Sequence, residues 1–397
     1  MMNWLNHDRG RSARRGLRTL WIALALAGCG GGVDSGGTGS ASFASGTITG
    51  FGSVIVNGVH FDDNRANVTD ADGTARSRDD LRLGMTTEIR GSAIGTDATG
   101  TTVSTASSIT FGSEIVGPIT RIDPTTSQLV VLGQPVDIVS TTVFDDTSLS
   151  GGLPALRLGD VVEVYALFDA SGGRYTATRI ERKGAAATFV LRGVVSQLDT
   201  AAKAFLIGNQ RISYAAFSGA LPAALANGSL VRVRLRIAQV GGAWIVSALN
   251  DGVKEPMDKD EVRLEGRVSA FASAAQFSVD GVVVDAGALA ATAGLALGVQ
   301  VEVEGTARGA VLVARQVKVK TADDVAAETF ELRGQVASAD ATARSFVLRG
   351  VTVVYSATAT EFKDGTPAGL VAGTNVEARG KLSSDGTQLV ATRIQFK

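Results

Sequence analysis

The chain has 397 residues, of which 45% are hydrophobic and 6% aromatic, with 48 glycines but only 7 prolines. This composition favours many short strands joined by glycine turns over disorder or a helical bundle, and the length predicts roughly two to four domains. Residues 1–28 hold five of the 38 basic and one of the 39 acidic residues, so the remainder has 33 and 38 and a net charge of −5. No general basic field is left to attract nucleic acid.

The N-terminal segment predicts export. Five arginines between Arg9 and Arg18 precede the apolar run Leu20 to Ala27, which is too short to span a bilayer but typical of a signal peptide. The next residues, Leu26-Ala27-Gly28-Cys29, resemble a bacterial lipobox. That resemblance implies a signal peptide over 1–28, cleavage before Cys29 and a diacylglycerol on its sulfur, so the predicted membrane contact is through this lipid. Ordinary cleavage after Ala27 is the alternative.

A tether and a location follow from the residues after the cysteine. Residues 29–45 are rich in Gly and Ser and predict a flexible, lipid-anchored tether. Gly30 stands where an Asp would resemble an inner-membrane retention signal. We therefore expect a cell-envelope protein anchored in the outer membrane. Because Cys29 is the only cysteine, intrachain disulfides and thiolate metal clusters are excluded.

Three landmarks recur in one order, five times, at a spacing of about 70 residues. They are a glycine that opens an apolar strand, a turn glycine, and the pattern Leu-x-x-Gly followed by an apolar, charged, apolar triplet. The strand-opening glycines are Gly46, Gly117, Gly193, Gly266 and Gly334, the turn glycines are Gly58, Gly133, Gly208, Gly281 and Gly350, and the pattern glycines are Gly84, Gly159, Gly228, Gly298 and Gly373. The predicted modules are residues 46–112, 113–183, 188–250, 261–320 and 328–397.

Alternation of apolar and polar residues predicts strands in each module. In the last module they are 330–336, 345–348, 351–355, 375–380 and 388–396. Ala-rich loops predict helical turns at 221–226 and 288–297. Three strands, a short helix and two strands is the order of an OB-type barrel, so the predicted fold is all-β, a tandem array of about five small OB-like barrels. The alternative is one closed five-bladed propeller. Since the joints between modules are polar or Ala-rich, we expect separate barrels in an elongated chain.

The first module also carries a family resemblance. Its stretch from Gly46 to Phe61, followed by Leu81, Gly84 and Glu88 to Gly91, resembles the bacterial family catalogued as domain of unknown function 5666. Members of that family are exported, often lipid-anchored, multi-copy β proteins. The resemblance is loosest in the third module, where Arg232 and Leu235 replace an acidic residue and a glycine. It implies the fold and no particular activity.

Candidate chemical residues are few. Beyond residue 28 the one histidine is His60, which lacks a nucleophile-elbow motif and is predicted to be a strand residue beside a turn. The acidic pairs Asp62-Asp63 and Asp70 with Asp72 do not match a calcium loop and predict Asx turns. We expect no metal and no cofactor. A glutamate recurs at one strand position, with Arg232 in its place in the third module, and predicts a solvent-facing cross-strand partner; the glutamates are Glu88, Glu163, Glu302 and Glu377.

The leading functional hypothesis is a non-catalytic envelope protein whose repeated modules bind or scaffold a protein or glycan. Recurrent modules without a recurrent catalytic constellation favour binding over turnover. Two alternatives stay open: a purely structural spacer, and an enzyme of unrecognised type acting on cell-wall glycan through two carboxylates. OB-like barrels that bind single-stranded nucleic acid need a positive groove and stacking aromatics, and neither is visible in the sequence.

Overall fold

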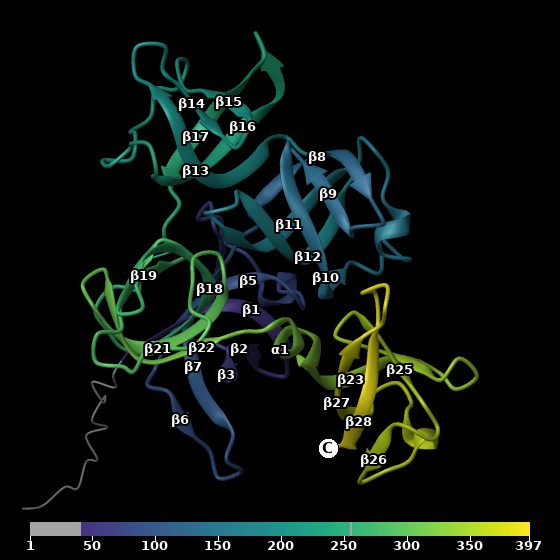
Figure 1. The fold of residues 1–397 in the computed structure, drawn as a ribbon. Coiled ribbons are helices and arrows are strands. Elements are labelled where there is room, and N and C mark those ends of the chain that lie inside the picture. The colour runs from purple at the N-terminus through teal and green to yellow at the C-terminus, as the bar shows by residue number, and fades with distance from the viewer. Residues whose placement is uncertain (1–40, 255) are drawn as a thin grey trace, which may run out of the picture. The chain divides into compact units, whose positions relative to one another are not determined.

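The computed structural model describes residues 41–254 and 256–397. Cys29, the predicted signal peptide and most of the predicted tether lie outside these residues. The described part forms five small closed β-barrels in succession, barrel 1 to barrel 5 (Figure 1). The predicted all-β array of barrels is confirmed, and the single propeller is not observed. Within the described ranges no helix has the length and apolar character needed to cross a bilayer.

The strands of the five barrels follow one another in chain order. Barrel 1 has β1 (Ser42–Phe51), β2 (Val54–Val56), β3 (Val59–Asp62), β4 (Asn67–Asp70), β5 (Thr86–Gly91), β6 (Gly95–Thr96) and β7 (Thr102–Phe111). Barrel 2 has β8 (Ile115–Asp123), β9 (Gln128–Val131), β10 (Gln134–Phe144), β11 (Val161–Asp169) and β12 (Arg174–Lys183). Barrel 3 has β13 (Phe189–Asp199), β14 (Ala204–Ile207), β15 (Gln210–Ser213), β16 (Leu230–Val240) and β17 (Ala243–Asp251).

Barrels 4 and 5 repeat this plan. Barrel 4 has β18 (Lys259–Ser273), β19 (Gln276–Val279), β20 (Val282–Asp285), β21 (Gln300–Arg308) and β22 (Val311–Val319). Barrel 5 has β23 (Phe330–Asp340), β24 (Ser345–Leu348), β25 (Val351–Tyr355), β26 (Glu361–Lys363), β27 (Asn375–Leu382) and β28 (Leu389–Phe396). The strands predicted for the last module agree with β23, β24, β25, β27 and β28 to within a few residues.

Each barrel closes in the same way. In barrel 3, β13 pairs antiparallel with β14 and with β16, β14 pairs with β15, and β16 pairs with β17. A parallel pairing of β15 with β17 completes the ring. The equivalent parallel closures are β3 with β7, β10 with β12, β20 with β22 and β25 with β28. Closure removes the exposed strand edges that an open sheet of this size would present.

Two sets of landmark glycines hold backbone that other residues adopt only at a cost. The turn glycines have φ between 55° and 89°, and the glycines of the Leu-x-x-Gly pattern have φ between 80° and 91°. Before the turn glycine, Asn57, Leu132, Asp280 and Arg349 also have positive φ. Two successive positive φ values are typical of the tight hairpin turns that match the strand twist. The glycines therefore recur because the same turn geometry, with positive φ, recurs in each barrel.

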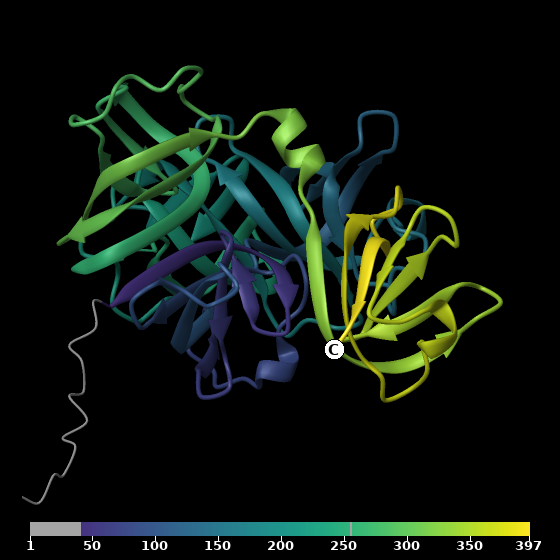
Figure 2. The same ribbon diagram turned by 90° about the horizontal axis from the view of Figure 1, so that it is seen from below.

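The predicted helical turns are wrong. Residues 221–226 and 288–297 form turns without helix, because short segments interrupted by Pro222 and by Gly294 at φ 76° cannot repay helix nucleation. In barrels 1, 2 and 5 the same loop contains a 3-10 turn, at Arg78–Asp80, Leu153–Ala155 and Pro367–Gly369. Among the described residues the one α-helix is α1 (Ala322–Ala327), which joins β22 to β23 (Figure 2).

The barrels are not separate, which corrects a second expectation. The first strand of barrel 1 pairs in parallel with β18 of barrel 4 from Ser42 to Ser45, and with β23 of barrel 5 at Gly50 and Phe51. Between barrels 2 and 3, β8 pairs with β13. Ser42 to Ser45 also pair with β5, so the predicted tether over 29–45 is too long at its C-terminal end. The Gly/Ser-rich composition did not indicate this strand, because Phe43 and Ala44 are buried through contacts with segments far away in the chain.

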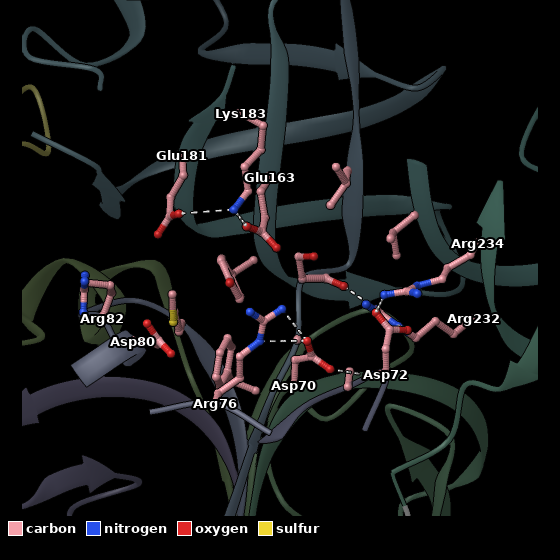
Figure 3. A pocket seen from close by; sticks show the side chains of 18 residues that line it. Asp70, Asp72, Arg76, Asp80, Arg82, Glu163, Glu181, Lys183, Arg232 and Arg234 are labelled. Carbon is pink, nitrogen blue, oxygen red and sulfur yellow. Dashed lines mark hydrogen bonds and ion pairs between the residues drawn. The ribbon is translucent and has the colours of Figure 1, made fainter. Parts of the chain in front are cut away.

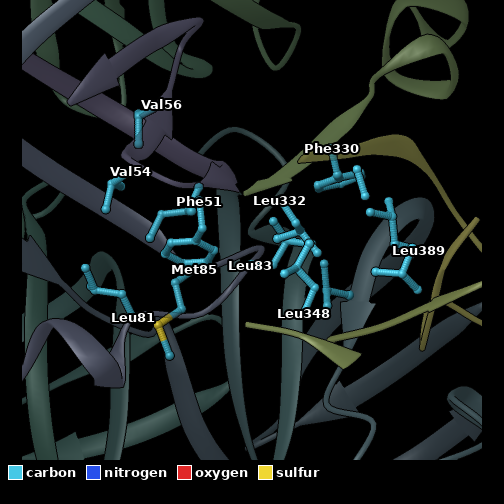
Figure 4. Packing of buried hydrophobic residues seen from close by; sticks show 14 of the residues in the cluster. Phe51, Val54, Val56, Leu81, Leu83, Met85, Phe330, Leu332, Leu348 and Leu389 are labelled. Carbon is cyan, nitrogen blue, oxygen red and sulfur yellow. The ribbon is translucent and has the colours of Figure 1, made fainter. Parts of the chain in front are cut away.

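The buried apolar side chains also join neighbouring barrels, because each of the three core clusters contains residues from more than one barrel. One core cluster combines barrel 1 with barrel 5, including Phe51 and Leu83 with Leu332 and Leu348 (Figure 4). A second cluster combines barrels 2 and 3. The third fills barrel 4 and includes Phe43, which belongs to β1. A barrel of this size buries a small core, and sharing that core between neighbours adds apolar burial that each barrel lacks alone.

Candidate functional site

A charged cavity of about 350 Å³ opens where barrels 1, 2 and 3 meet (Figure 3). Barrel 1 provides the turn after β4, barrel 2 provides β11 and β12, and barrel 3 provides β16. Acidic and basic side chains are equal in number along its walls. The acidic ones are Asp70, Asp72, Asp80, Glu163 and Glu181, and the basic ones are Arg76, Arg82, Lys183, Arg232 and Arg234.

Asp70 organises the barrel 1 wall. Its Oδ1 accepts hydrogen bonds from the backbone N–H groups of Asp72 at 3.0 Å and Thr74 at 2.9 Å, and its Oδ2 accepts two from the Arg76 guanidinium at 2.9 and 2.7 Å. Partial burial by itself raises the pKa of Asp70, but these hydrogen bonds outweigh burial and the pKa is lowered. Asp70 is therefore a fixed anion at neutral pH.

Asp72 connects barrel 1 to barrel 3. Arg234 Nη2 donates to Asp72 Oδ2 at 2.6 Å, and Arg232 Nε lies 3.8 Å from Asp72 Oδ1. Arg232 also donates from Nη1 to the carbonyl of Ser113, in the joint between barrels 1 and 2. The Nε atoms of Arg232 and Arg234 are buried without a hydrogen-bond partner within the described part of the chain. Arg232, which replaces the recurring glutamate, thus contacts barrel 1 and the joint between barrels 1 and 2.

The barrel 2 wall holds an ammonium group between two carboxylates. Lys183 Nζ lies 2.5 Å from Glu163 Oε2 and 3.9 Å from Glu181 Oε2. Burial alone lowers the pKa of Lys183, but the charge and the hydrogen bond of Glu163, together with the charge of Glu181, outweigh burial and the pKa is raised. Lys183 therefore stays protonated at neutral pH. The cavity offers fixed charges of both signs, which suits recognition of a polar ligand.

Three of the four recurring glutamates form diagonal ion pairs, and the fourth, Glu88, pairs in register with Thr110. In the strand register, Glu163 lies opposite Glu181, Glu302 opposite Lys318 and Glu377 opposite Gln395. Each glutamate instead forms its salt bridge with a lysine further along the partner strand. These salt bridges are Glu163 with Lys183, Glu302 with Lys320 at 3.0 Å and Glu377 with Lys397 at 2.9 Å. In each case the lysine lies two residues beyond the register partner, which is the diagonal neighbour on one face of a sheet. The predicted cross-strand role fits, but the Glu377 side chain is only 11% exposed rather than solvent-facing.

The other predicted residues lie on strand β3 and in the turn that follows it. Asp62 Oδ1 accepts from the backbone N–H of Asn64 at 3.1 Å, which is an Asx turn, and Asp63 lies 3.4 Å from Arg78. His60 is on β3, and its Nδ1 lies 3.3 Å from Ser53 Oγ. Across residues 41–254 and 256–397, no group of three or more His, Cys, Asp or Glu side chains is placed to hold a metal ion.

Sequence reasoning missed a buried ion network that joins three barrels. Arg192 of β13 is 2% exposed, and it donates to Glu114 Oε2 at 3.0 Å, to Asp280 Oδ1 at 2.8 Å and to the carbonyl of Gly252 at 2.6 Å. Glu114 precedes barrel 2 and Asp280 belongs to barrel 4. The sequence does not indicate that Arg192 is buried. The segment Leu191-Arg192-Gly193 has the same residues as Leu332-Arg333-Gly334 of barrel 5, and Arg333 is exposed.

Fold and cavity together define an all-β protein built from duplicated small barrels. The family model described as a domain of unknown function, DUF5666, matches three segments, residues 116–181, 265–318 and 333–395. These segments fall in barrels 2, 4 and 5, which is consistent with tandem copies of that domain and confirms the predicted resemblance. The residues of barrel 1 that suggested it lie outside the three matched segments. No curated protein matches the chain.

Proposed function

We propose that this chain is a non-catalytic cell-envelope protein, anchored through a lipid on Cys29, whose barrels together bind or scaffold a protein or glycan. The observation that carries the proposal is the charged cavity between barrels 1, 2 and 3. Its ionic groups come from three barrels, and Arg232 and Arg234 of barrel 3 lie against Asp72 of barrel 1. A site of that kind recognises a polar partner by complementary charge and keeps the barrels in register while doing so.

The protonation states in the cavity also support binding over turnover. A general acid near neutral pH needs a carboxyl group with a raised pKa, and a lysine nucleophile needs a lowered pKa. Asp70 and Lys183 are shifted in the opposite directions. These groups are suited to stay charged and hold a partner.

Anchoring is tested with Cys29→Ala in the full chain. We expect the wild-type protein to enter the detergent phase and carry added lipid mass, and the variant to stay in the aqueous phase, because only the thiol can carry the thioether lipid. Cys29→Ser is the matched control and should behave as the alanine variant does. A wild-type protein without lipid mass would reject the envelope anchor.

Binding is tested by crosslinking the anchored protein to envelope components in cells, with an Arg234→Met variant as comparison. Loss of a specific crosslinked protein or glycan in the variant supports the binding role. A spacer predicts that the variant and the wild-type protein behave alike while deletion of a whole barrel changes envelope spacing.

A further inference from the structure

A second, larger cavity lies between barrels 1 and 5. Its volume is about 650 Å³, within the range of about 300 to 1,000 Å³ that is usual for small-ligand sites. The pairing of β1 with β23 and the shared apolar core hold its two walls together. We call it the barrel 1–5 cavity. The charged cavity described above lies between barrels 1, 2 and 3 and shares no lining residue with it.

The barrel 5 wall is the outer face of three neighbouring strands. Register aligns Glu331 with Arg379 and Arg393 in one row across β23, β27 and β28. The adjacent row aligns Arg333 with Glu377 and Gln395. All of these side chains line the cavity. Alternation along the strands places both rows on the outer face, because their neighbours Leu332, Ala378 and Ile394 are buried in the core.

Two cations on this wall have no full ionic partner. Both carboxylates are already engaged, since Arg379 lies 2.7 Å from Glu331 and 3.3 Å from Glu377, and Lys397 lies 2.9 Å from Glu377. Arg393 Nη2 donates to the neutral amide of Gln395 at 3.0 Å, its Nε is buried without a hydrogen-bond partner, and the carboxylate oxygen of Glu361 is 4.0 Å from that Nε. Arg333 is exposed and forms no salt bridge within the described ranges.

The barrel 1 wall has a different chemistry. It presents the carboxylates of Asp62 and Asp97, the hydroxyls of Thr99 and Thr101, and the His60 imidazole. Asp97 Oδ1 accepts hydrogen bonds from Thr99 and Thr101 at the tip of the β6–β7 hairpin, at 2.8 and 2.9 Å from their backbone nitrogens. Carboxylates accept hydrogen bonds and hydroxyls can donate or accept them, which matches the hydroxyl groups of a sugar ring.

We propose that the barrel 1–5 cavity binds an acidic oligosaccharide, with a sugar carboxylate on Arg333 and Arg393 and the ring hydroxyls on the barrel 1 wall. The two walls together select for such a ligand. An arginine fork pairs with a carboxylate through charge-assisted hydrogen bonds, and the carboxylates of Asp62 and Asp97 accept hydrogen bonds from ring hydroxyls on the opposite side. This inference rests on the proposed binding function and assigns its ligand class and site.

The test is calorimetric titration of the full mature chain with trigalacturonic acid. Galactotriose is the neutral comparison and sodium acetate is the free-anion comparison. We expect the acidic trisaccharide to bind and the neutral one to bind at least tenfold more weakly, with affinity falling as salt rises. The double variant Arg333→Met/Arg393→Met should lose at least tenfold in affinity. Arg393→Lys retains the charge without the fork and should fall between wild type and the double variant.

Arg308→Met is the matched control, because Arg308 is a surface arginine of barrel 4 with a single exposed partner, Asp260. It should bind like the wild-type chain. Equal binding of both trisaccharides, unchanged binding by the double variant, or acetate binding as tight as the saccharide (an adventitious ion only) would each overturn the inference. So would a wild-type chain that binds neither sugar. A partner crosslinked through the charged cavity and lost in Arg234→Met would still stand in that case, so the two proposals fail separately.

Discussion

At the scale of single residues, the most consequential groups are charges buried between barrels. Burial alone raises the pKa of Glu114, but the charges of Arg192 and Lys254 outweigh it and the pKa is lowered. Arg192 in turn has a raised pKa: burial lowers it, and the carboxylates of Asp280 and Glu114 more than compensate. A buried ion pair is weak evidence for net stability, but loss of one partner leaves an uncompensated charge.

The pH dependence of Glu114→Gln tests this network. Because the folded-state pKa of Glu114 is lowered, its contribution to stability is present above the usual carboxyl pKa and is lost as pH falls through the folded-state pKa. At pH 7 we expect the variant to be less stable than wild type by about 3 to 5 kcal/mol. Denaturant unfolding from pH 7 down to pH 3 should show this difference shrinking.

Glu361→Gln removes a carboxylate whose side chain is 57% exposed and serves as the control. It should differ little from the wild-type chain over the same pH range. A stability difference for Glu114→Gln that stays constant with pH would contradict the assignment of Glu114 as an ionised partner of Arg192.

At the scale of elements, glycine serves two separate purposes. Gly350 has φ 74° and open space where a Cβ would lie, so only its backbone conformation requires glycine. Gly380 lies at a bulge of β27, where a Cβ would clash with the Val390 carbonyl of the neighbouring strand. A bulge bends the strand so that the small barrel can close.

Two alanine variants distinguish these purposes. Gly350→Ala should cost about 1 to 2 kcal/mol, the usual penalty for a left-handed residue with a side chain. Gly380→Ala should cost more, because the strand pairing of β27 with β28 must shift as well. Thermal unfolding of the two single variants shows which substitution causes the larger loss of stability. Equal losses of stability in the two variants would show that the clash at Gly380 is relieved without disturbing the sheet.

At the scale of the whole molecule, first strands link the barrels. Phe43 is fully buried and belongs to β1 of barrel 1, yet it packs in the apolar core of barrel 4. Its backbone pairs with Val262 of β18 on one side and with Arg90 of β5 on the other. Barrel 4 is therefore completed by a residue more than two hundred positions earlier in the chain.

Phe43→Ala is expected to destabilise barrel 4 by about 3 to 5 kcal/mol, since a buried aromatic ring is lost and a cavity remains. Hydrogen exchange should show faster opening of the β20 and β22 amides, with little change in barrel 2. Phe271→Ala, at a site 39% exposed in the same barrel, is the control and should have a small effect. Equal effects of the two variants would mean that Phe43 is not part of the core of barrel 4.

The sequence by itself determined the repeated barrel, because its signals are local: alternation along strands, and glycines where φ must be positive. It also pointed to parts of the charged cavity, namely Asp70, Asp72, Glu163 and Arg232. It did not indicate Arg76, Lys183 or Arg234 as their partners, since those pairs depend on diagonal neighbours and on which barrels pack together.

Only the tertiary structure decided which of two equivalent charged side chains is buried and which is exposed. Arg192 and Arg333 both stand between a buried leucine and a strand-opening glycine, but Arg192 is buried between three barrels and Arg333 is exposed in the barrel 1–5 cavity. Local sequence specifies strand and turn geometry through short-range sterics. Burial of a charge depends on contacts between segments far apart in the chain, and these differ between barrels of the same fold.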